Sequence, residues 1–291
     1  MIQKLAILGV GLIGGSFALA LKRAGVVGQV IGYGRSRENL EAARTLGVLD
    51  GIAETPGAAV AEADAICLAA PVGALPTLLT EIAPYLRDDA LITDVGSTKQ
   101  DVIFAARAAL GDRMGQFVPG HPIAGAEDSG AAAARSELFH GKSVILTPLQ
   151  ENRAEAVARV SGWWQACGAE VTEMEAEHHD RIFAAVSHLP HLAAFALVAE
   201  LAERPEAAVF FRHAGSGFRD FTRIAASHPE MWRDIALANQ GALLDEIDRY
   251  QEALARLRKL LESSDSAALH ALFERASTAR RTLTSHLEKT S

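Results

Sequence analysis

Two short segments of the sequence carry residue types that can move a proton. Histidine has an ordinary pKa close to neutrality, so it can accept a proton during catalysis. His121 lies in "GHPIAG", where glycine and proline indicate a shaped loop just after a strand rather than a helix face. Ser97 lies in "DVGSTK", and its hydroxyl can form a hydrogen bond with a histidine. We therefore expect His121 to act as a base with Ser97 as its partner, the alternative being a structural histidine.

Two further segments, "SHLPH" (residues 187–191) and "GFRDFTR" (residues 217–223), place histidines and arginines in otherwise apolar surroundings. A guanidinium group matches the geometry of a carboxylate, so Arg219 and Arg223 are candidate receptors for an anionic substrate. The alternative is that they form ion pairs with Asp220 or Glu230. The sequence favours the receptor interpretation without excluding the ion pairs.

A metal site is not expected. "EHHD" at residues 177–180 contains ligand types, but adjacent histidines on a helix point in different directions, whereas metal ligands must converge. We predict that it is the solvent-exposed start of a helix. Cys67 and Cys167 lie in apolar segments without CxxC spacing, which argues against a zinc site or a disulfide and fits a reducing compartment.

A glycine-rich turn near the N-terminus predicts a dinucleotide cofactor. Gly9, Gly11 and Gly14 stand between an expected strand and an expected helix, the context in which this spacing is informative. Gly9 permits the tight turn, Gly11 the approach of the pyrophosphate, and Gly14 close packing of helix on strand. Leu12 and Ile13 begin the helix, whose free N–H groups and dipole favour phosphate.

The segment "GYGRSR" bears on which cofactor is bound. In proteins that bind NAD, a carboxylate about 20 residues after this turn binds the ribose, but Gly34 stands at that place. Gly34 leaves room for a 2'-phosphate, and Arg35, Ser36 and Arg37 can bind one. We expect NADP to be favoured and NAD to be possible. Alternatively the arginines are solvated and Glu38 reaches the ribose.

The order of strands and helices predicts how these residues are positioned. Strands and helices alternate up to about residue 175, which indicates an α/β fold with a doubly wound, Rossmann-type sheet over residues 1–176. Ligands bind outside the carboxyl ends of such strands, so Ser97 and Lys99 are expected to face the nicotinamide. Residues 177–291 show helical periodicity and predict an all-α substrate and dimerisation domain. Its long apolar faces predict a homodimer.

Composition excludes several classes of protein. The 291-residue chain has a net charge of −8, whereas nucleic-acid-binding proteins usually carry a basic surplus. The apolar N-terminal run is interrupted by glycines and is too short for a membrane span, and its flanks do not fit a signal peptide. We expect a cytoplasmic enzyme that acts on a small molecule, without a membrane or nucleic-acid partner.

Taken together, "GVGLIGGS", "DVGSTK", "GHPIAG", "SHLPH" and "GFRDFTRIA", in this order and spacing, resemble the prephenate/arogenate (cyclohexadienyl) dehydrogenases of tyrosine biosynthesis. The resemblance covers nearly the whole chain. It implies oxidative decarboxylation: hydride leaves the ring carbon that bears the hydroxyl, and loss of carbon dioxide makes the ring aromatic. It also implies an active site between a Rossmann domain and a helical dimerisation domain.

The resemblance assigns roles to matching positions. It implies that His121 accepts the hydroxyl proton, that Ser97 bridges this histidine, the substrate and the cofactor, and that Arg223 binds a substrate carboxylate. Residues implied to line or gate the pocket are His188, His191, Glu127 and Asp220. No fused chorismate mutase and no extra regulatory domain are expected, so any inhibition by tyrosine would act at the active site.

Two other interpretations remain open. Another two-domain NADP-dependent enzyme, of the β-hydroxyacid dehydrogenase or pyrroline-carboxylate reductase type, would require neither "GHPIAG" nor "GFRDFTR" and would be expected to use a lysine base. A non-catalytic NADP sensor would bind cofactor without turnover and tolerate His121→Asn, but it would leave the polar segments without a purpose.

Overall fold

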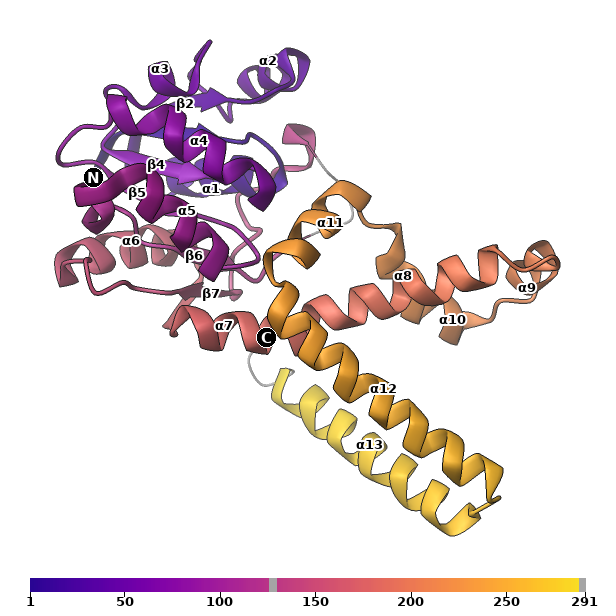
Figure 1. Cartoon of the computed structure of the whole chain (residues 1–291). Coiled ribbons are helices and arrows are strands. Elements are labelled where there is room, and N and C mark those ends of the chain that lie inside the picture. Colours follow the sequence, from indigo (N-terminus) through magenta and orange to yellow (C-terminus); the bar gives the residue numbers. More distant parts are fainter. Residues whose placement is uncertain (126–129, 288–291) are drawn as a thin grey trace. The chain divides into compact units, whose positions relative to one another are not determined.

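The computed structural model describes residues 1–125 and 130–287, with side chains described as far as residue 282. Its N-terminal part contains a five-stranded parallel sheet with the order β3-β2-β1-β4-β5 (Figure 1). The chain switches direction across this sheet between β1 and β4, and ligands of such sheets bind at that point, outside the carboxyl ends of the strands. The strands are β1 (Ile2–Leu8), β2 (Val27–Tyr33), β3 (Gly51–Ile52), β4 (Ala65–Leu68) and β5 (Leu91–Asp94).

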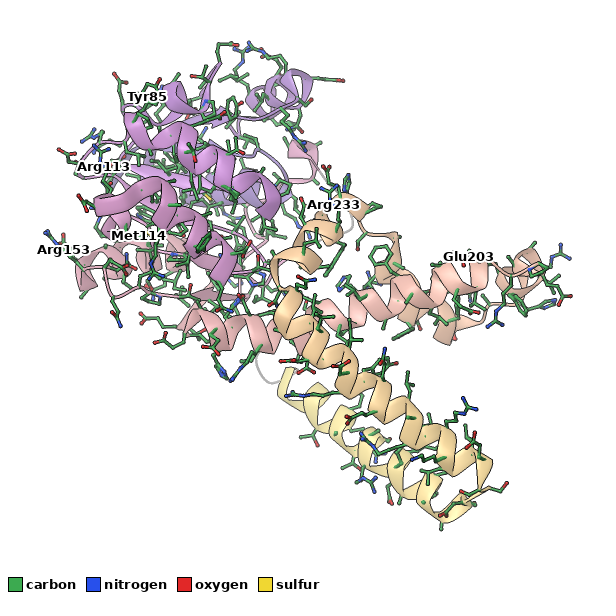
Figure 2. All side chains as sticks on the ribbon, viewed as in Figure 1. Tyr85, Arg113, Met114, Arg153, Glu203 and Arg233 are labelled. Carbon is green, nitrogen blue, oxygen red and sulfur yellow. The ribbon has the colours of Figure 1, made fainter. Side chains whose placement is uncertain are left out.

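Both faces of this sheet are covered. Successive side chains of a strand point to opposite faces, and β1 accordingly places Leu5 and Ile7 in one core cluster and Ala6 and Leu8 in the other. Met114, labelled in Figure 2, is buried in the second cluster. The first cluster also includes residues of α1 (Leu12–Arg23), α2 (Arg37–Thr45) and α6 (Ala154–Ala166), and the second residues of α3 (Pro56–Val60), α4 (Leu75–Ile82) and α5 (Gln100–Leu110).

A second, three-stranded sheet carries His121. It consists of β6 (Gly120–Pro122), β7 (Ser143–Leu146) and β8 (Glu170–Glu173), with β6 antiparallel and β8 parallel to β7. The segment before β6 is tied to β5 by a backbone hydrogen bond of 2.8 Å from Val118 N–H to the Ile92 carbonyl. The prediction that His121 follows a strand is wrong, because His121 pairs with Ile145 inside β6.

Beyond residue 173, the described part of the chain contains helices and no strand, in agreement with the predicted all-α region. Helices α7 and α8 are joined without a break by a π-helical turn at Ala184–His188. The helices are α7 (Ala176–Phe183), α8 (Leu189–Ala202), α9 (Ala207–Arg212), α10 (Ser216–Thr222), α11 (Pro229–Ala238), α12 (Gln240–Glu262) and α13 (Ser266–Leu287).

The chain divides into two compact units, Met1–Gln240 and Gly241–Ser291. The first unit contains both sheets and the helices up to α11, and the second contains α12 and α13. This division falls inside the predicted helical domain, and the predicted boundary after residue 176 stays a prediction.

The continuous helix Ala176–Ala202 is long and apolar enough to cross a membrane by length and composition alone. Its C-terminal end is followed by Glu203, which is labelled in Figure 2. The same helix carries three buried polar side chains, His179, Asp180 and His188, each with hydrogen-bond partners inside the first unit. Those partners make this helix part of the folded unit that holds His121.

Candidate active site

The turn between β1 and α1 contains three glycines with different structural requirements. Gly9 has φ of +102°, and a Cβ there would lie 2.5 Å from the backbone at the end of β4. A Cβ at Gly14 would lie 2.4 Å from the Gly9 carbonyl oxygen. A Cβ at Gly11, by contrast, would meet no atom within 4 Å. Packing therefore explains Gly9 and Gly14, whereas Gly11 keeps an approach open that fits a dinucleotide pyrophosphate.

The start of α1 supplies donors for that approach. The first intrahelical hydrogen bond runs from Gly15 N–H to the Gly11 carbonyl at 2.9 Å. The N–H groups of Leu12 and Ile13 precede it and therefore have no acceptor within the helix, as at any helix N-terminus. They lie at the positive end of the helix dipole, where a phosphate is favoured.

The arginine-rich segment after β2 has one exposed guanidinium and one that is already paired. Arg35 is exposed. Ser36 begins α2 and its hydroxyl accepts the N–H of Asn39 at 3.2 Å. Arg37 pairs with Glu41 at 2.8 Å and with Glu54 at 2.6 Å. Ser36 and Arg37 thus have partners within the protein, and a phosphate would compete with them.

Gly34 is not required by packing. A Cβ there would touch only Leu40 and the Val10 backbone, at 3.6 Å or more, which is ordinary contact. The position accepts a side chain sterically, so the absence of a carboxylate there is a chemical difference from the NAD-type pattern.

A buried ion pair fixes the backbone next to His121. Asp94 ends β5 and Lys99 follows five residues later, and the side chains of both are fully buried in contact with each other. Lys99 Nζ also donates to the Gly120 carbonyl at 2.7 Å, and Asp94 Oδ1 accepts the Gly120 N–H at 3.0 Å. The expectation that Lys99 faces the nicotinamide is therefore wrong, because its ammonium group is enclosed between β5 and β6.

His121 is buried, with 9% of its surface exposed. Its Nδ1 lies 2.8 Å from His179 Nε2, and the Phe183 ring lies 4.7 Å from its own ring, between centroids. Burial lowers the pKa of His121 well below 6.5, and positive charge at His179, Lys99 and His188 would lower it further. His121 is therefore neutral at pH 7, the state in which one ring nitrogen can accept a proton.

The prediction that "EHHD" is a solvated helix start is correct for Glu177 and His178 and wrong for His179 and Asp180. Glu177 and His178 are exposed, but His179 is 0% and Asp180 1% exposed. The physical reason is the helical period: positions 176, 179, 180 and 183 share one face of α7, and Phe183 on that face packs against both histidine rings. An apolar residue on each side of this pair, at i, i+3, i+4 and i+7 spacing, was the signal available in the sequence.

Asp180 connects this face of α7 to α5. One carboxylate oxygen accepts His179 Nδ1–H and the Lys99 N–H, both at 2.8 Å, and the other accepts the Gln100 N–H at 2.9 Å. Burial opposes ionisation, but these hydrogen bonds outweigh it and hold the pKa of Asp180 below its ordinary value. Asp180 is therefore a buried carboxylate whose negative charge faces His179.

His188 lies at the end of the π-helical turn, a distortion often found at functional sites. Asn239 donates through Nδ2 to the Asp180 carbonyl at 2.8 Å and to His188 Nδ1 at 3.1 Å. His188 Nε2 must then carry the proton; it forms no hydrogen bond of standard geometry among the described residues, although the Ser97 backbone lies close enough to raise the pKa of His188. Burial has the larger effect and lowers that pKa to about 4, against the attraction of Asp180 as well. A buried N–H donor without a well-formed hydrogen bond is costly unless a ligand supplies a better acceptor.

His191 and Arg223 form the more exposed side of the site. The His191 ring stacks on Trp232 at 3.7 Å, and its Nδ1 donates to the Ser187 carbonyl at 2.8 Å. Burial lowers the pKa of His191, and the nearby positive charge of Arg223 lowers it further. Trp232 was not anticipated from the sequence; its Nε1 is buried without a partner among the described residues.

The structure brings together some of the residues expected at the site and leaves others apart. His188 acts electrostatically on His121 and interacts with the Ser97 backbone, and His191 lies near Arg223. Among the described residues the His121 side chain meets His179 rather than Ser97, so the partnership of Ser97 with His121 stays a prediction. Asp220 is exposed on α10, and Glu127 lies outside the described residues. Among the described residues Arg219 forms no ion pair with Asp220 or Glu230: it donates to the Ala214 carbonyl at 3.3 Å, and Glu230 pairs with Arg233.

A search for metal-binding groups among the described residues finds no set of three or more His, Cys, Asp or Glu side chains that could hold an ion. The three clustered histidines instead have partners consistent with hydrogen-bonded imidazoles. The geometry is that of a buried, neutral histidine on β6, beside the end of β5 in the parallel sheet, with Arg223 close to the neighbouring His191.

Family comparisons agree with this geometry. Residues 17–173 match the family model described as prephenate dehydrogenase, nucleotide-binding domain, and residues 175–275 match the prephenate dehydrogenase dimerization domain. The chain belongs to the prephenate dehydrogenase family. The enzyme is 37% identical to a cyclohexadienyl dehydrogenase of Zymomonas mobilis over 97% of this chain and 96% of the relative. It is 40% identical to a prephenate dehydrogenase of Bacillus subtilis, over 92% and 72% of the two chains.

Solved structures give the same result. A prephenate dehydrogenase from Aquifex aeolicus, in complex with hydroxyphenyl propionate and NAD+, matches with a TM-score of 0.91 and 35% identity, over 97% of this chain and 99% of that one. An arogenate dehydrogenase from Synechocystis matches with a TM-score of 0.81 and 28% identity, over 97% and 100%.

These matches confirm three predictions from the sequence: the family, the Rossmann-type sheet followed by a helical region, and an oxidoreductase of tyrosine biosynthesis that performs oxidative decarboxylation with a nicotinamide cofactor. They give no support to the alternative reductase or sensor interpretations. The C-terminal half of the chain is of the dimerisation-domain type.

Proposed function

We propose that the enzyme oxidatively decarboxylates prephenate, arogenate or both, giving 4-hydroxyphenylpyruvate or tyrosine, with His121 as the base. The observation that carries the proposal is the state of His121: it is neutral, buried and hydrogen-bonded through Nδ1, so that Nε2 is the nitrogen left to accept a proton. A base of this kind contributes most when its protonation state and its position are both fixed before the substrate arrives.

The proposed chemistry uses the chain's residues as follows. His121 Nε2 takes the proton of the hydroxyl on ring carbon C4, while Ser97 holds that hydroxyl and the histidine in line. The glycine turn and the N–H groups of Leu12 and Ile13 would hold a nicotinamide cofactor, which would supply the acceptor for the hydride of C4. The electrons of the bond between the ring and its carboxylate enter the ring as carbon dioxide leaves, which gives an aromatic phenolate, and His121 Nε2–H then returns its proton to that oxygen to form the phenol of the product. Aromatisation drives the reaction, so the proposal requires no metal.

The substrate carboxylates need cationic or hydrogen-bonding partners. We assign this role to Arg223, with His191 beside it and His188 Nε2–H as a further donor. The assignment is supported by the Arg223 charge acting on His191 and by the buried His188 Nε2–H, which lacks a hydrogen bond of standard geometry among the described residues. Asp220 and Glu127 remain proposed pocket residues on the strength of their motifs. A neutral ketone or a charged amine in the substrate side chain distinguishes prephenate from arogenate, and either fits this assignment.

For the cofactor we propose that NADP is preferred and NAD accepted. Gly34 presents no carboxylate to a 2'-phosphate, and Arg35 is an exposed guanidinium beside it. The sequence assigned the binding of the 2'-phosphate to Arg35, Ser36 and Arg37 together. Because Ser36 and Arg37 already have partners, we assign most of this binding to Arg35. Arg35→Ala should raise KM for NADP about tenfold and leave KM for NAD within about twofold. Arg44→Ala, at an exposed arginine of helix α2, which begins just after Arg35, is the control. Equal effects on both cofactors would contradict the assignment.

For the assembly we propose a homodimer formed through the helical region. The family match to a dimerisation domain supports it, as do the half-exposed aromatic side chains Phe210, Phe211 and Phe221 on α9 and α10. The apolar surface of Ala176–Ala202 is then a protein contact, which supports a cytoplasmic enzyme. Light scattering during size-exclusion chromatography should give twice the mass of the chain, and a monomer would contradict the proposal.

Inhibition by tyrosine at the active site is a further expectation, and rates unchanged in a tyrosine titration would contradict it.

The experiment that tests the activity is a set of initial rates with prephenate and arogenate, each with NADP and NAD. Formation of reduced nicotinamide with either substrate supports the proposal, provided that one equivalent of carbon dioxide is released for each hydride transferred. Reduction without carbon dioxide release would contradict it.

A further inference from the structure

His179 and Asp180 have no role in the reaction as proposed above, yet among the described residues His179 forms the hydrogen bond of the His121 side chain, and Asp180 forms one with His179. His121 Nδ1 and His179 Nε2 are 2.8 Å apart, and His179 Nδ1 and Asp180 Oδ1 are also 2.8 Å apart. Both residues are essentially inaccessible to solvent. The three side chains thus form a continuous chain of hydrogen bonds from a carboxylate on α7 to the base on β6.

The direction of each hydrogen bond follows from the carboxylate. An ionised carboxylate only accepts, so the nitrogen that faces Asp180, His179 Nδ1, must carry a proton. In a neutral His179 the other nitrogen, Nε2, is then bare and must accept from His121 Nδ1–H. His121 in turn has a bare Nε2. The ionisation of Asp180 therefore decides which nitrogen of His121 can act as the base.

Asp180 is itself held in place. Its two oxygens accept the Lys99 and Gln100 N–H groups at the start of α5, at 2.8 and 2.9 Å. These are donors at a helix N-terminus, where negative charge is stabilised. The same loop carries Ser97 and the Lys99 side chain that holds Gly120. The carboxylate and the strand that carries His121 are thus anchored to one element.

We propose that Asp180 and His179 are positioning residues that hold His121 as its Nδ1–H tautomer and stabilise the positive charge that His121 gains when it takes the substrate proton. The inference rests on the proposed function, which it deepens by naming what prepares the base. The hydroxyl proton ends on His121 Nε2, the Nδ1 proton stays shared with His179, and Asp180 supplies the opposing negative charge. No other group is oxidised, reduced or protonated in this step.

Phe183 strengthens the arrangement. Its ring lies 4.7 Å from the His121 ring and 4.5 Å from the His179 ring, between centroids, and covers both. Water is kept from the hydrogen bond that joins the two histidines, so His121 Nδ1–H has His179 as its acceptor. In a low-dielectric surrounding, the loss of that acceptor costs more than it would at a surface.

Two substitutions of His179 separate this role from a structural one. His179→Met keeps the approximate volume and removes the acceptor, whereas His179→Gln keeps a side-chain oxygen that can accept His121 Nδ1–H. We expect His179→Met to lower kcat about 100-fold with KM within about threefold, because the wrong tautomer of the base is a defect in the chemical step. His179→Gln should recover at least about tenfold of that loss. His178→Gln, at the exposed neighbour, is the control and should match the wild type.

The decisive readout is independent of turnover. Nitrogen-15 NMR of histidine-labelled protein distinguishes a protonated from a bare ring nitrogen, and the His121 signals can be assigned by their loss in His121→Asn. In the wild type we expect His121 with Nδ1 protonated and Nε2 bare, and in His179→Met a shift toward the Nε2–H tautomer. A wild-type His121 with Nε2 protonated would overturn the proposal, even if the variants fail to fold.

The kinetic measurements also test the positioning role of His179. Equal losses in His179→Met and His179→Gln, or a loss confined to KM, would overturn the positioning role. If the wild type showed no turnover with prephenate or arogenate, the proposed function would fall, whereas the NMR result would still show whether Asp180 and His179 set the tautomer of His121.

Discussion

The base side and the arginine side of the candidate site are built in opposite ways. Around His121, the side chains of Asp94, Lys99, His179 and Asp180 are at most 2% exposed, and each is hydrogen-bonded to another part of the first unit. On α10 and the turn after it, Asp220 and Arg223 are exposed. The proton acceptor is therefore fixed by the fold, whereas the anion receptor is closer to solvent.

The difference predicts which measured quantity each side controls. Buried charges and hydrogen bonds act in a medium of low dielectric constant, so they hold a geometry tightly and are costly to break. Exposed charges are hydrated and screened, and they gain most of their value when a ligand covers them. Changes on the base side should reduce kcat or unfold the protein, and changes on the arginine side should raise KM.

The largest expected effect is the loss of the base. His121→Asn should lower kcat by about 10³-fold to about 10⁴-fold, because the proposed acceptor of the substrate hydroxyl proton is removed. Assays with the four pairings of substrate and cofactor measure this loss of kcat. His140→Asn, at an exposed histidine, is the matched control. A loss of less than about tenfold would show that His121 is not the base, and it would contradict the difference proposed between the two sides.

The next effect concerns folding. Lys99→Met leaves the Asp94 carboxylate buried without its cation, and we expect the free energy of unfolding to fall by about 3–5 kcal/mol. Urea denaturation measures this change. Arg258→Met, which breaks the exposed pair with Glu262, should cost less than about 1 kcal/mol. Similar costs for the two variants would show that the base side is no more tightly held than the surface.

A smaller effect is expected on the arginine side. Arg223→Ala should raise KM for the substrate about 10-fold to about 100-fold and change kcat by less than about threefold, since a hydrogen bond to a charged group contributes about 1.5–3 kcal/mol. Arg212→Ala, at another exposed arginine of the helical region, serves as the control. A fall in kcat with unchanged KM would place Arg223 with the chemical step and contradict the division.

The smallest expected effect is that of low pH on the free energy of unfolding. The pKa values of His121, His188 and His191 are all lowered in the folded enzyme, that of His188 to about 4, mainly by burial. The unfolded chain binds these protons near pH 6.5, so the stability from the neutral histidines is complete above pH 6.5 and is lost as the pH falls toward 4. Urea denaturation at a pH of about 7 and about 5 should show this loss, and a smaller one in His188→Asn. A pH dependence that His188→Asn leaves unchanged would argue against a buried neutral His188.

The sequence was informative where function depends on neighbouring residues. The glycine turn and the alternation of strands and helices over about the first 175 residues follow from local spacing, because turns and helix ends are set by a few consecutive side chains. His121 and Ser97 were selected by the same kind of local reasoning, and the family match then gave the order of motifs its meaning.

The contacts on the base side could not be predicted from local spacing, because they join residues that are far apart in the sequence. Asp180 meets Lys99 from 81 residues away, and His179 meets His121 from 58 residues away. Lys99, expected to face the cofactor, is enclosed, and the pair in "EHHD" expected to be solvated is buried. In both cases a charged side chain inside the protein depends on partners that local pattern does not reveal.

The most direct test of the account is the rate of reduced-nicotinamide formation by the wild type and by His121→Asn, with prephenate and with arogenate and with each cofactor. We expect turnover of at least one substrate, faster with NADP, with release of carbon dioxide and near-complete loss of kcat in the variant. No turnover in any of the four pairings, or a variant as active as the wild type, would contradict it.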